Sequence, residues 1–504
     1  MQGGNEVELK LEIEPRDAPE LIDHVLLRGR QMCSGRQSSV YYDTGKGALR
    51  EAGYSLRVRS SGGRFVQTVK RQGDGGAGLF DRPEWEREIA GAEPDLAALD
   101  ETPLGPVLAK GRLRKRLKPI VSAEVERTVW LLPHEGSEIE MVLDRGAIRG
   151  GKREAEVSEV ELELRRGKAT ALLGIARLLA EQVPLKIGVM TKAERGFALA
   201  GGDVGKAAKA EPVGLDAQMS VADGFAAIVH ACLRHFRRNE PLVLGERDAA
   251  ALHQSRVAMR RLRSAFSLFG PAIADAEFGR LREELRWFTE QLGEARNLDV
   301  FLKRLPDGRR TKAFRRRLGA ARERAYDRVI EALHAKRMRA MMIDLVAWAE
   351  VGAWRNSEAA AAPLPSFAEA QLDRRWRKVR KNGRDIAGLD PEPRHRLRID
   401  VKKLRYAVEF LAGLHAEAPS QKPFIAALEA MQERLGELND METARELVAG
   451  LPEELRAEAS AFAASNPREE AKRTETLLAE AQAAQRRLTE AGPFWRSRGE
   501  AAAA

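Results

Sequence analysis

Glu6-Val7-Glu8-Leu9-Lys10 is the stretch that decides how the first half of this chain folds. Charged and apolar residues alternate in it, and the alternation continues through Glu12 and Glu14. Because successive side chains of a strand point to opposite faces, one face is charged and the other is apolar. A single strand of this kind is ordinarily half-buried with its charges in water. The return of the pattern in later strands argues against that ordinary interpretation.

Further alternating segments follow within the first 200 residues. Strands are expected at 40–44, 54–59, 64–70, 84–88, 123–132, 138–144 and 157–164, and helices at 19–27, 95–118 and 170–182. Arg57 and Arg59 share one face of their strand, and Glu159, Glu161 and Glu163 form a second row of carboxylates. Seven or eight short strands joined mostly by turns predict an antiparallel barrel or a strongly curved sheet.

The charged faces of these strands allow two arrangements. They could all point outward around an apolar core, or they could line a hydrated lumen while the apolar faces pack under helices. Carboxylates hold Mg²⁺ or Mn²⁺, and Arg and Lys neutralise phosphoryl oxygens. Rows of both signs therefore suit a lumen for a metal–polyphosphate complex, but the pattern alone leaves both arrangements open.

Composition limits the class of protein. The 504 residues predict two to four domains, and 32% charged residues with a mean hydropathy of −0.41 indicate a soluble globular chain. No run of about 18 apolar residues and no signal-peptide segment is found, and Cys33 and Cys232 support neither a disulfide framework nor a thiolate metal site. We therefore expect a cytoplasmic protein with no membrane span.

The net charge of +10 is concentrated in the second half of the chain. Residues 1–200 contain 32 Lys and Arg against 31 Asp and Glu, whereas the remainder contains 53 against 44. This C-terminal surplus predicts a polyanionic partner for the second half.

Several N-terminal motifs together resemble the CYTH superfamily, the triphosphate tunnel metalloenzymes. They are Glu-x-Glu-x-Lys at 6–10, Tyr-Tyr-Asp-Thr at 41–44, Leu-Arg-Val-Arg at 56–59, Thr-Val-Lys at 68–70, the row Glu159–Glu163 and Lys192-Ala-Glu-Arg-Gly at 192–196. The resemblance covers roughly residues 4–200 and implies an eight-stranded antiparallel β-barrel tunnel that binds a linear triphosphate. Thr191 stands where the family often has Ser, and Lys186 where it often has Arg.

The resemblance also implies roles for individual residues. The catalytic residues would be Glu6, Glu8 and Lys10. The divalent metal, Mg²⁺ or Mn²⁺, would be held by Glu6, Glu8, Glu161 and Glu163 with help from Asp144 and Glu159. The phosphates would be bound by Lys10 together with Arg57, Arg59, Lys70, Arg127, Lys186, Lys192 and Arg195. Glu84, Glu86 and Glu140 would be further lumen carboxylates. The residue that orients the attacking water is left open between a carboxylate of the rows and Lys10.

The second half of the chain changes character after residues 201–218, which lack periodicity and are expected to be a linker. Apolar residues then recur at helical spacing, and a motif repeats. His253-x-x-Arg256-x-x-x-Arg260-Arg261-Leu262-Arg263 returns as His395-x-x-Arg398-x-x-x-Lys402-Lys403-Leu404-Arg405, 142 residues later. The repeat predicts two related helical bundles produced by duplication.

Each motif places basic residues along one stripe of a helix, because the spacing i, i+3, i+7, i+10 keeps them on one side. Met259, Leu262, Phe266 and Phe269 would form the apolar side of the first such helix. A solvated basic face is the ordinary interpretation, but an acid-free stripe that appears twice favours a positive groove. Further basic residues would enlarge it: Arg234, Arg237, Arg238, Arg374, Arg375, Arg377, Lys378, Arg380 and Lys381.

This pattern resembles the CHAD domain, a helical module named for its conserved histidines, here His253 and His395. The resemblance covers about 216–495 and implies binding of long-chain inorganic polyphosphate by the ten basic motif residues quoted above. Lys402-Lys403 depart from Arg260-Arg261 and lose bidentate geometry. We therefore expect a multidomain protein, α+β followed by all-α, with a tunnel domain at 1–202, a linker at 203–218 and a helical domain at 219–496 whose two copies span about 219–350 and 366–496.

The resulting hypothesis is a metal-dependent inorganic triphosphatase joined to a polyphosphate-binding domain, in the cytoplasm and associated with polyphosphate granules. One alternative is a non-catalytic polyphosphate-binding or targeting protein. Another is a tunnel enzyme for a different triphosphate, such as thiamine triphosphate or ATP. Nucleic acid is disfavoured as the partner because few aromatic residues interleave with the basic stripe. The sequence does not indicate an oligomeric state.

Overall fold

The computed structural model describes residues 2–71, 76–305, 308, 311–442, 448, 451, 453–463 and 467–496. The chain forms two compact units. The first contains residues 1–208 with the segments Leu233–Leu242 and Leu333–Val351, and the second contains Lys209–Cys232, Val243–Ala332 and Gly352–Ala504. Among the described helices, none combines the length and the apolar character that crossing a bilayer requires.

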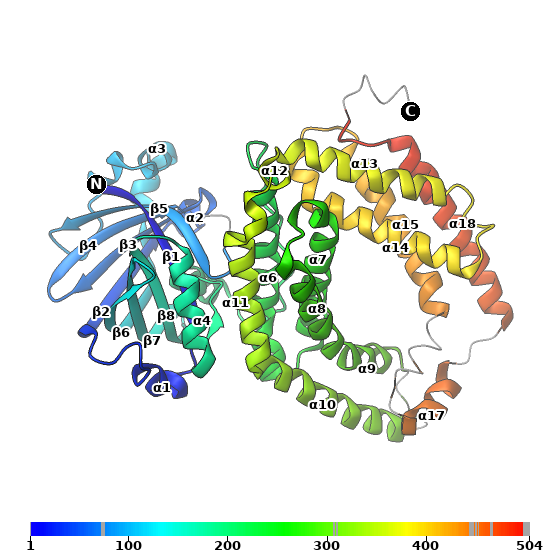
Figure 1. Cartoon of the computed structure of the whole chain (residues 1–504), viewed down its shortest axis with the longest axis horizontal. Coiled ribbons are helices and arrows are strands. Elements are labelled where there is room, and N and C mark those ends of the chain that lie inside the picture. Colours follow the sequence, from blue (N-terminus) through cyan, green and yellow to red (C-terminus); the bar gives the residue numbers. More distant parts are fainter. Residues whose placement is uncertain are drawn as a thin grey trace. The chain divides into compact units, whose positions relative to one another are not determined.

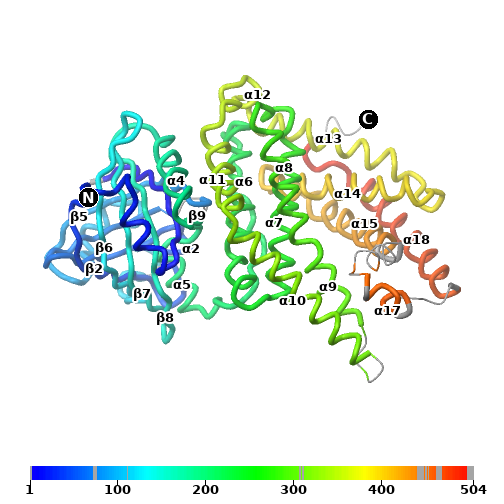
Figure 2. The backbone as a smooth tube through the Cα atoms, turned by 60° about the horizontal axis from the view of Figure 1, so that its bottom comes forward, coloured from blue at the N-terminus to red at the C-terminus, as the bar shows by residue number. Residues whose placement is uncertain are grey.

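The first unit is built on a closed antiparallel barrel. Its eight main strands are β1 (Gln2–Glu12), β2 (Gln31–Asp43), β3 (Tyr54–Ser61), β4 (Arg64–Arg71), β5 (Leu79–Ile89), β6 (Lys118–His134), β7 (Ser137–Gly150) and β8 (Arg153–Arg166). They are ordered β5-β4-β3-β2-β6-β7-β8-β1, and pairing of β1 with β5 closes the ring (Figures 1 and 2). A two-residue strand, β9 (Lys186–Ile187), pairs with β1. The barrel predicted from the sequence is confirmed.

The apolar strand faces pack outward under helices, and the charged faces therefore line the inside. Leu56 of β3 and Val69 of β4 are buried against Leu49 of α2 (Ala48–Glu51) and Leu104 of α3 (Leu104–Ala109). On another side, α4 (Thr170–Gln182) buries Leu172, Leu173, Ile175, Ala176 and Leu179. Of the two arrangements left open by the sequence, the structure has the charged lumen.

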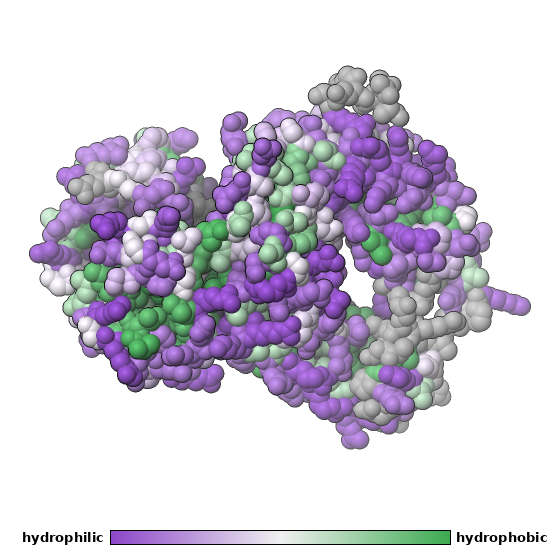
Figure 3. Space-filling model, in the orientation of Figure 1, coloured by the Kyte–Doolittle hydropathy of each residue, from purple (hydrophilic) through white to green (hydrophobic). Residues whose placement is uncertain are grey.

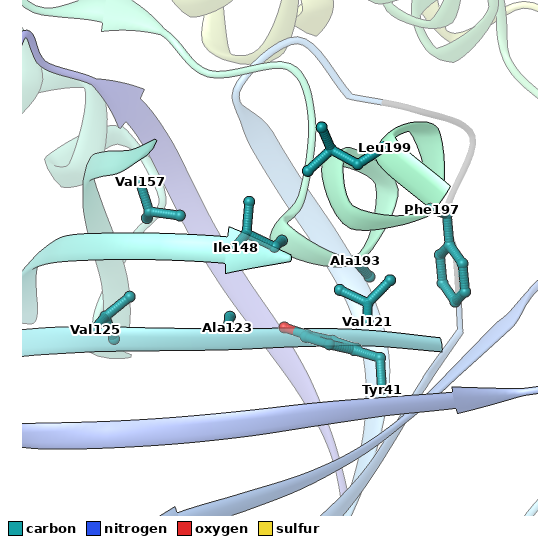
Figure 4. Close-up of a cluster of buried hydrophobic side chains, with 9 residues drawn as sticks. All are labelled: Tyr41, Val121, Ala123, Val125, Ile148, Val157, Ala193, Phe197 and Leu199. Carbon is teal, nitrogen blue, oxygen red and sulfur yellow. The ribbon is translucent and has the colours of Figure 1, made fainter. Parts of the chain in front are cut away.

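One part of the interior is filled by the helix that follows β9, α5 (Lys192–Gly201). Its Ala193, Phe197 and Leu199 pack on the inner faces of the strands, against Val121, Ile148 and other apolar side chains (Figure 4). Gly196 permits this close approach, because a Cβ there would lie 2.1 Å from Val121 Cγ1. Thr191 and Glu194 form a capping box at the start of the helix. The capped helix thereby fixes the position of its first residue, Lys192.

The short helices of this unit differ from the expectation. The helix expected over 19–27 ends early: η1 (Pro15–Asp17) leads into α1 (Ala18–Ile22), and His24 Nδ1 then accepts a hydrogen bond from the Leu26 amide at 3.2 Å in place of a helical carbonyl. The region 95–118 is divided into η2 (Ala98–Glu101), α3 and η3 (Lys110–Arg116), with a break at the extended Thr102.

The remaining described elements are helices. They are α6 (Val221–Glu246), α7 (Ala249–Ile273), α8 (Ala276–Gln291), α9 (Gly293–Arg304), α10 (Lys312–His334), α11 (Lys336–Val351), η4 (Ala353–Asn356), α12 (Glu358–Ala361), α13 (Leu364–Asn382), α14 (Pro391–Leu411), η5 (Ala412–His415), α15 (Gln421–Glu442), α17 (Glu453–Ala463) and α18 (Pro467–Ala491). The visible surface over α13 is mostly hydrophilic (Figure 3).

Within the second unit, the two motif helices α7 and α14 contact each other. Arg260 of α7 donates a hydrogen bond to the Tyr406 hydroxyl of α14, and the Arg261 guanidinium carbon lies 5.2 Å from the Phe410 ring centroid. Met259, Leu262, Phe266 and Phe269 are all buried, as the apolar stripe predicted.

Candidate active site

The interior of the barrel contains a cavity of about 170 Å³ lined by charged residues from most of its strands. Its cationic lining residues are Lys10, Arg57, Arg59, Lys70, Arg82, Arg127, Arg165 and Lys192. Its carboxylates are Glu6, Glu8, Glu84, Glu86, Glu140, Glu161, Glu163 and Glu194. The apolar cluster of α5 borders the cavity at Tyr41, Ala123, Val125 and Ala193.

The most deeply buried charges form a cluster at Asp144, Glu159 and Glu161. Lys10 Nζ donates to Glu159 at 2.9 Å and also to Glu161. Lys192 Nζ lies 2.7 Å from Asp144 and 3.1 Å from Glu161, and it also donates to Glu159. The strand register brings these side chains together, because Lys10 pairs with Glu161 between β1 and β8, and Asp144 pairs with Glu159 between β7 and β8.

Arg127 completes this cluster from β6. Its guanidinium donates to both oxygens of Asp144, at 2.8 and 2.6 Å, and to Glu161 at 3.1 Å. Asp144 is fully buried, and Lys10 is 2% exposed. Such burial is tolerated because every charge in the cluster has opposite charges within ion-pair distance.

The pairing dominates the protonation states of the cluster. Burial alone would lower the pKa of Lys10, but Glu159 and Glu161 outweigh it and raise that pKa above its ordinary value. Burial would raise the pKa of Glu161, but Lys10 and Lys192 hold it well below its ordinary value. Lys10 is therefore a permanent cation and Glu161 a permanent anion near neutral pH.

A second cluster joins β1, β4 and β5. Lys70 Nζ lies 2.5 Å from Glu6 and 3.3 Å from Glu84. The Arg82 guanidinium donates to Glu8 at 2.5 Å and lies 3.6 Å from Glu6. Burial and the neighbouring Glu6 raise the pKa of Glu84 to about 7, although Lys70 opposes the shift.

A third group lies on β3, β4 and β5. Arg59 donates to Glu86 at 2.8 Å, and Arg57 donates to Thr68 at 3.3 Å while lying 3.8 Å from Glu86. Repulsion from Arg57 lowers the pKa of Arg59, with burial as the next cause. Arg57 also lies 4.0 Å from Glu84, and the two guanidiniums, on the same face of β3, can bind an anion together.

Glu163 lies in the lining near Glu140. Arg165 donates to Glu163 at 2.7 Å and lies 2.8 Å from Glu140. Burial raises the pKa of Glu163 to about 7, and Glu6 and Glu140 add to the shift against the opposing Arg165.

In the second unit, the first basic stripe lacks neutralising acids. Arg256, Arg260, Arg263 and Arg296 form no ion pair with any other described residue. Burial lowers the pKa of His253 to about 4, with repulsion from Arg296, Arg260 and Arg256 adding to it. The pKa of Arg256 falls to about 10 for the same reasons, burial first. This stripe is an uncompensated positive surface.

The second stripe is neutralised from within the domain. Arg405 lies 2.6 Å from Glu409 and 3.9 Å from Glu429. His395 Nδ1 is hydrogen-bonded to Asn439 at 2.8 Å, whereas the corresponding position near His253 is Arg296. Arg398 and Lys402 are half-buried. The two stripes therefore differ in ion pairing despite their similar sequences.

Two family models match the two parts of the chain. Residues 4–197 match the CYTH domain, and residues 227–449 match the CHAD domain. The chain consists of a CYTH domain followed by a CHAD domain. Over 199 residues it is 30% identical to an inorganic triphosphatase of Haemophilus influenzae. That alignment covers 38% of this chain and only 54% of the Haemophilus protein.

Two solved structures are similar to parts of this chain. The crystal structure of the CHAD domain from the plant Ricinus communis is 28% identical, with 56% of this chain and 97% of that chain covered and a TM-score of 0.47. A Hippeastrum protein described as having a dominant triphosphatase activity is 20% identical, with 39% of this chain and 96% of that chain covered and a TM-score of 0.29.

Within the CYTH domain, most of the residues expected to bind metal or phosphate line the cavity, and four do not. Asp144 and Glu159 lie beneath the lining as partners of Lys192 and Lys10. Arg195 lies 3.4 Å from Glu159 and donates to the Glu156 carbonyl. Lys186 lies 3.2 Å from Glu240, in the α6 segment that belongs to the first unit.

Sequence reasoning missed two cavity cations, Arg82 and Arg165. Arg82 lies two residues before Glu84 on β5, so its position on the same strand face was a usable signal. Arg165 likewise follows Glu163 on the same face of β8. Arg82 is 8% exposed, and its Nε has no hydrogen-bond partner among the described residues.

In the CHAD domain, the structure separates neighbouring motif residues. Arg261 is 8% exposed and stacks on Phe410, away from the surface stripe of Arg260. Lys403 lines a cavity that Lys402 does not. Arg237, expected to enlarge the groove, is instead buried between Glu12 and Glu240 in the first unit.

The CYTH cavity has a donor set that suits a hard divalent cation. Asp144, Glu159 and Glu161 each present an oxygen within 4.8 Å of the others. Oxygen-only donors are what Mg²⁺ and Mn²⁺ prefer. In the structure Lys10, Lys192 and Arg127 neutralise these oxygens, so a divalent metal held here would displace those cations from the carboxylates. The oxygen donors themselves fit a divalent metal.

Proposed function

We propose that the CYTH domain hydrolyses inorganic triphosphate to pyrophosphate and phosphate with Mg²⁺ or Mn²⁺. The supporting observation is the barrel interior, where eight cationic side chains and eight carboxylates face one cavity. The CYTH match and the partial similarity to an inorganic triphosphatase support the same reaction.

The charge balance of the cavity favours a metal–phosphate complex over a bare polyanion. With every group ionised, the eight cations and eight carboxylates of the lining balance, and the raised pKa values of Glu84 and Glu163 make the lining slightly positive near neutral pH. A bare triphosphate must therefore break cation–carboxylate pairs without compensation. When a divalent metal occupies the carboxylates, Lys and Arg side chains become available for phosphoryl oxygens.

Arg57 and Arg59 are suited to orient the phosphate chain, because they lie side by side on β3 with few competing carboxylates. Lys10, Arg127 and Lys192 would bind the part of the chain nearest the deep cluster and stabilise charge that spreads during phosphoryl transfer. A bound Mg²⁺ or Mn²⁺ would polarise phosphoryl oxygens and lower the pKa of a coordinated water.

Lys10 is excluded as the base that accepts a proton from water. Its ammonium lies between Glu159 and Glu161, and its pKa is raised above the ordinary lysine value. It therefore keeps its proton near neutral pH and acts as a fixed positive charge. A carboxylate of the rows is the class of residue suited to accept that proton, and Lys10 can still orient the water as a hydrogen-bond donor.

For the CHAD domain we propose binding of long-chain inorganic polyphosphate. Support comes from the first basic stripe, whose Arg256, Arg260 and Arg263 have no ion-pair partner among the described residues. A polyanion would supply the missing negative charge. Association with polyphosphate granules in the cytoplasm follows from such binding.

Phosphate release from tripolyphosphate tests the tunnel proposal on the full chain. We expect release with Mg²⁺ or Mn²⁺, none with EDTA, and a large loss in Glu161→Gln. Glu126→Gln is the matched control, because Glu126 is exposed on β6 and pairs loosely with Arg145 at 3.5 Å. No release from the wild type, or equal release from Glu161→Gln, would support a non-catalytic binding protein. Faster turnover of thiamine triphosphate or ATP would reassign the substrate.

Competition binding tests the CHAD proposal. Labelled long-chain polyphosphate should bind the full chain, and Arg256→Gln/Arg260→Gln should weaken it. RNA that displaces polyphosphate at physiological salt would overturn the assignment. Arg286→Gln is a suitable control, because Arg286 is exposed on α8 and pairs with Glu283 at 3.0 Å.

A further inference from the structure

A second cavity lies in the CHAD domain. It has a volume of about 250 Å³ and lies between α7, α13 and α14. Its lining residues are Ser267, Pro271, Gln371, Arg374, Arg375, Lys378, Asp400 and Lys403. Neither His253 nor His395 lines it, although Lys403 belongs to the second motif and Arg374, Arg375 and Lys378 were expected to enlarge the groove.

The charges around this cavity are unbalanced. Four cations face it, and Asp400 is the single carboxylate of the lining. Within the described part of the chain, none of Arg374, Arg375, Lys378 and Lys403 forms an ion pair. Arg375 donates instead to the Gln371 side chain at 2.8 Å and to the Ser267 carbonyl at 3.2 Å. Burial lowers the pKa of Arg375 to about 10, with repulsion from Arg374 as the second cause.

The duplication supplies an internal comparison for this place. The buried positions of α6 and α13 match at a spacing of 143 residues, and those of α7 and α14 match at 142. The pairs are Val221/Leu364, Phe225/Ala368, Val229/Leu372, Leu233/Trp376, Phe236/Val379, Met259/Val401 and Leu262/Leu404. By these spacings, Arg375 corresponds to Cys232, Lys403 to Arg261, and Ser267 to Glu409.

The corresponding place in the other copy is buried, and a carboxylate there balances positive charge. Cys232 is 1% exposed, and burial raises the pKa of its thiol to about 11. Arg261 and Glu409 are both close enough to act electrostatically on that thiol. The Glu409 carboxylate, which pairs with Arg405 at 2.6 Å, therefore compensates the positive charge on that side, whereas the cavity has a serine at the matching position and four cations.

We propose that this cavity is a binding site for a compact inorganic oligophosphate such as pyrophosphate. The anion would take the place that the Glu409 carboxylate has in the other copy. Arg and Lys recognise phosphate oxygens, with Arg374 and Arg375 on one wall and Lys403 on the other. None of the lining residues that the structure describes has an aromatic side chain that could stack on a base, which disfavours nucleotides and nucleic acid. The cavity is too small to enclose a long polymer.

Lysine footprinting on the full chain in EDTA tests the site. Lys378 and Lys403 are exposed and should react with an amine-specific methylating reagent. Pyrophosphate should slow both reactions, roughly tenfold when about nine-tenths of the sites are filled. Lys422, exposed on α15 outside the cavity, is the internal control and should react at an unchanged rate.

Ser267→Glu is the decisive variant, since it introduces the carboxylate of the other copy at an exposed position. It should abolish protection by pyrophosphate, and the neutral Ser267→Gln should retain it. Equal rates with and without pyrophosphate in the wild type, or unchanged protection in Ser267→Glu, would overturn the proposal. Protection by long-chain polyphosphate but not by pyrophosphate would also overturn it and assign the cavity to the polymer groove.

Discussion

Asp144→Asn tests whether the deep cluster of the tunnel is held together by its charges. Asp144 is fully buried, accepts two hydrogen bonds from Arg127 at 2.8 and 2.6 Å, and lies 2.7 Å from Lys192. The substitution keeps the side-chain shape and removes one charge. We therefore expect the main effect to be electrostatic.

The magnitude follows from a count of charges. Lys10, Arg127, Lys192 and Arg195 face Asp144, Glu159 and Glu161, so the cluster has a charge of +4 − 3 = +1. Asp144→Asn changes it to +4 − 2 = +2 around a position that is itself fully buried. Removing one partner of a buried ion pair costs about 3–5 kcal/mol. The exposed control Glu126→Gln should cost about 0–1 kcal/mol.

Native-state hydrogen exchange measures this effect locally, which avoids assuming that two units unfold together. Amides of β7 in metal-free Asp144→Asn should exchange roughly a hundredfold faster or more, the equivalent of about 3 kcal/mol. Asp144→Asn/Lys192→Met restores the charge to +3 − 2 = +1, and should recover about 1–3 kcal/mol through coupling. A cost below about 1 kcal/mol for Asp144→Asn, or no recovery in the double variant, would refute the reasoning.

Three further predictions concern the other clusters. Arg82→Gln removes the hydrogen-bond partner that lies 2.5 Å from Glu8. Mg²⁺ or Mn²⁺ should therefore bind more tightly, while the KM for tripolyphosphate rises by about 10-fold or more. Unchanged metal titrations and kinetics would contradict a role for Arg82. His253 has a pKa of about 4 in the free protein, and a bound polyanion should raise it, so polyphosphate affinity should increase as pH falls from 8 to about 5. His253→Gln should flatten that dependence, and His395→Gln, whose histidine contacts Asn439, is the matched comparison. Glu409→Gln releases Arg405 from its 2.6 Å ion pair and should strengthen polyphosphate binding with a steeper salt dependence. Titration with polyphosphate at two ionic strengths measures both effects. Weaker binding would show instead that the ion pair positions Arg405.

Much of the barrel and of its charged faces could be predicted because local alternation encodes them. Glu6, Glu8 and Lys10 occupy alternate positions of one strand, so their side chains share a face, and Glu161 and Glu163 share a face of β8 for the same reason. Strand lengths were harder to predict. β2 begins at Gln31 rather than near residue 40, because its first half is exposed and lacks an alternating pattern.

Pairing between distant segments could not be read from local patterns. Lys186 fits the expected phosphate-binding motif, yet its nearest carboxylate is Glu240, more than fifty residues away. Adjacent motif residues such as Arg260 and Arg261 look equivalent in sequence, but successive helical positions differ by about 100° and only one can face the solvent. Arg405 pairs with Glu409 one turn away on α14 at 2.6 Å, and only its longer 3.9 Å contact with Glu429 involves a different helix.

The position of Lys192 at the start of α5 has a mechanical consequence. The same helix places Ala193, Phe197 and Leu199 in the apolar cluster and Lys192 in the deep cluster. A ligand therefore cannot draw the backbone of Lys192 toward itself without dislodging packed side chains. Only rotations of the lysine side chain can adjust the site to a ligand. The conformational entropy of this backbone segment is therefore lost during folding, and not again at each binding event. A rigid site of this kind selects anions by their length, because the backbone cannot move to complete the contacts of an anion that is too long or too short.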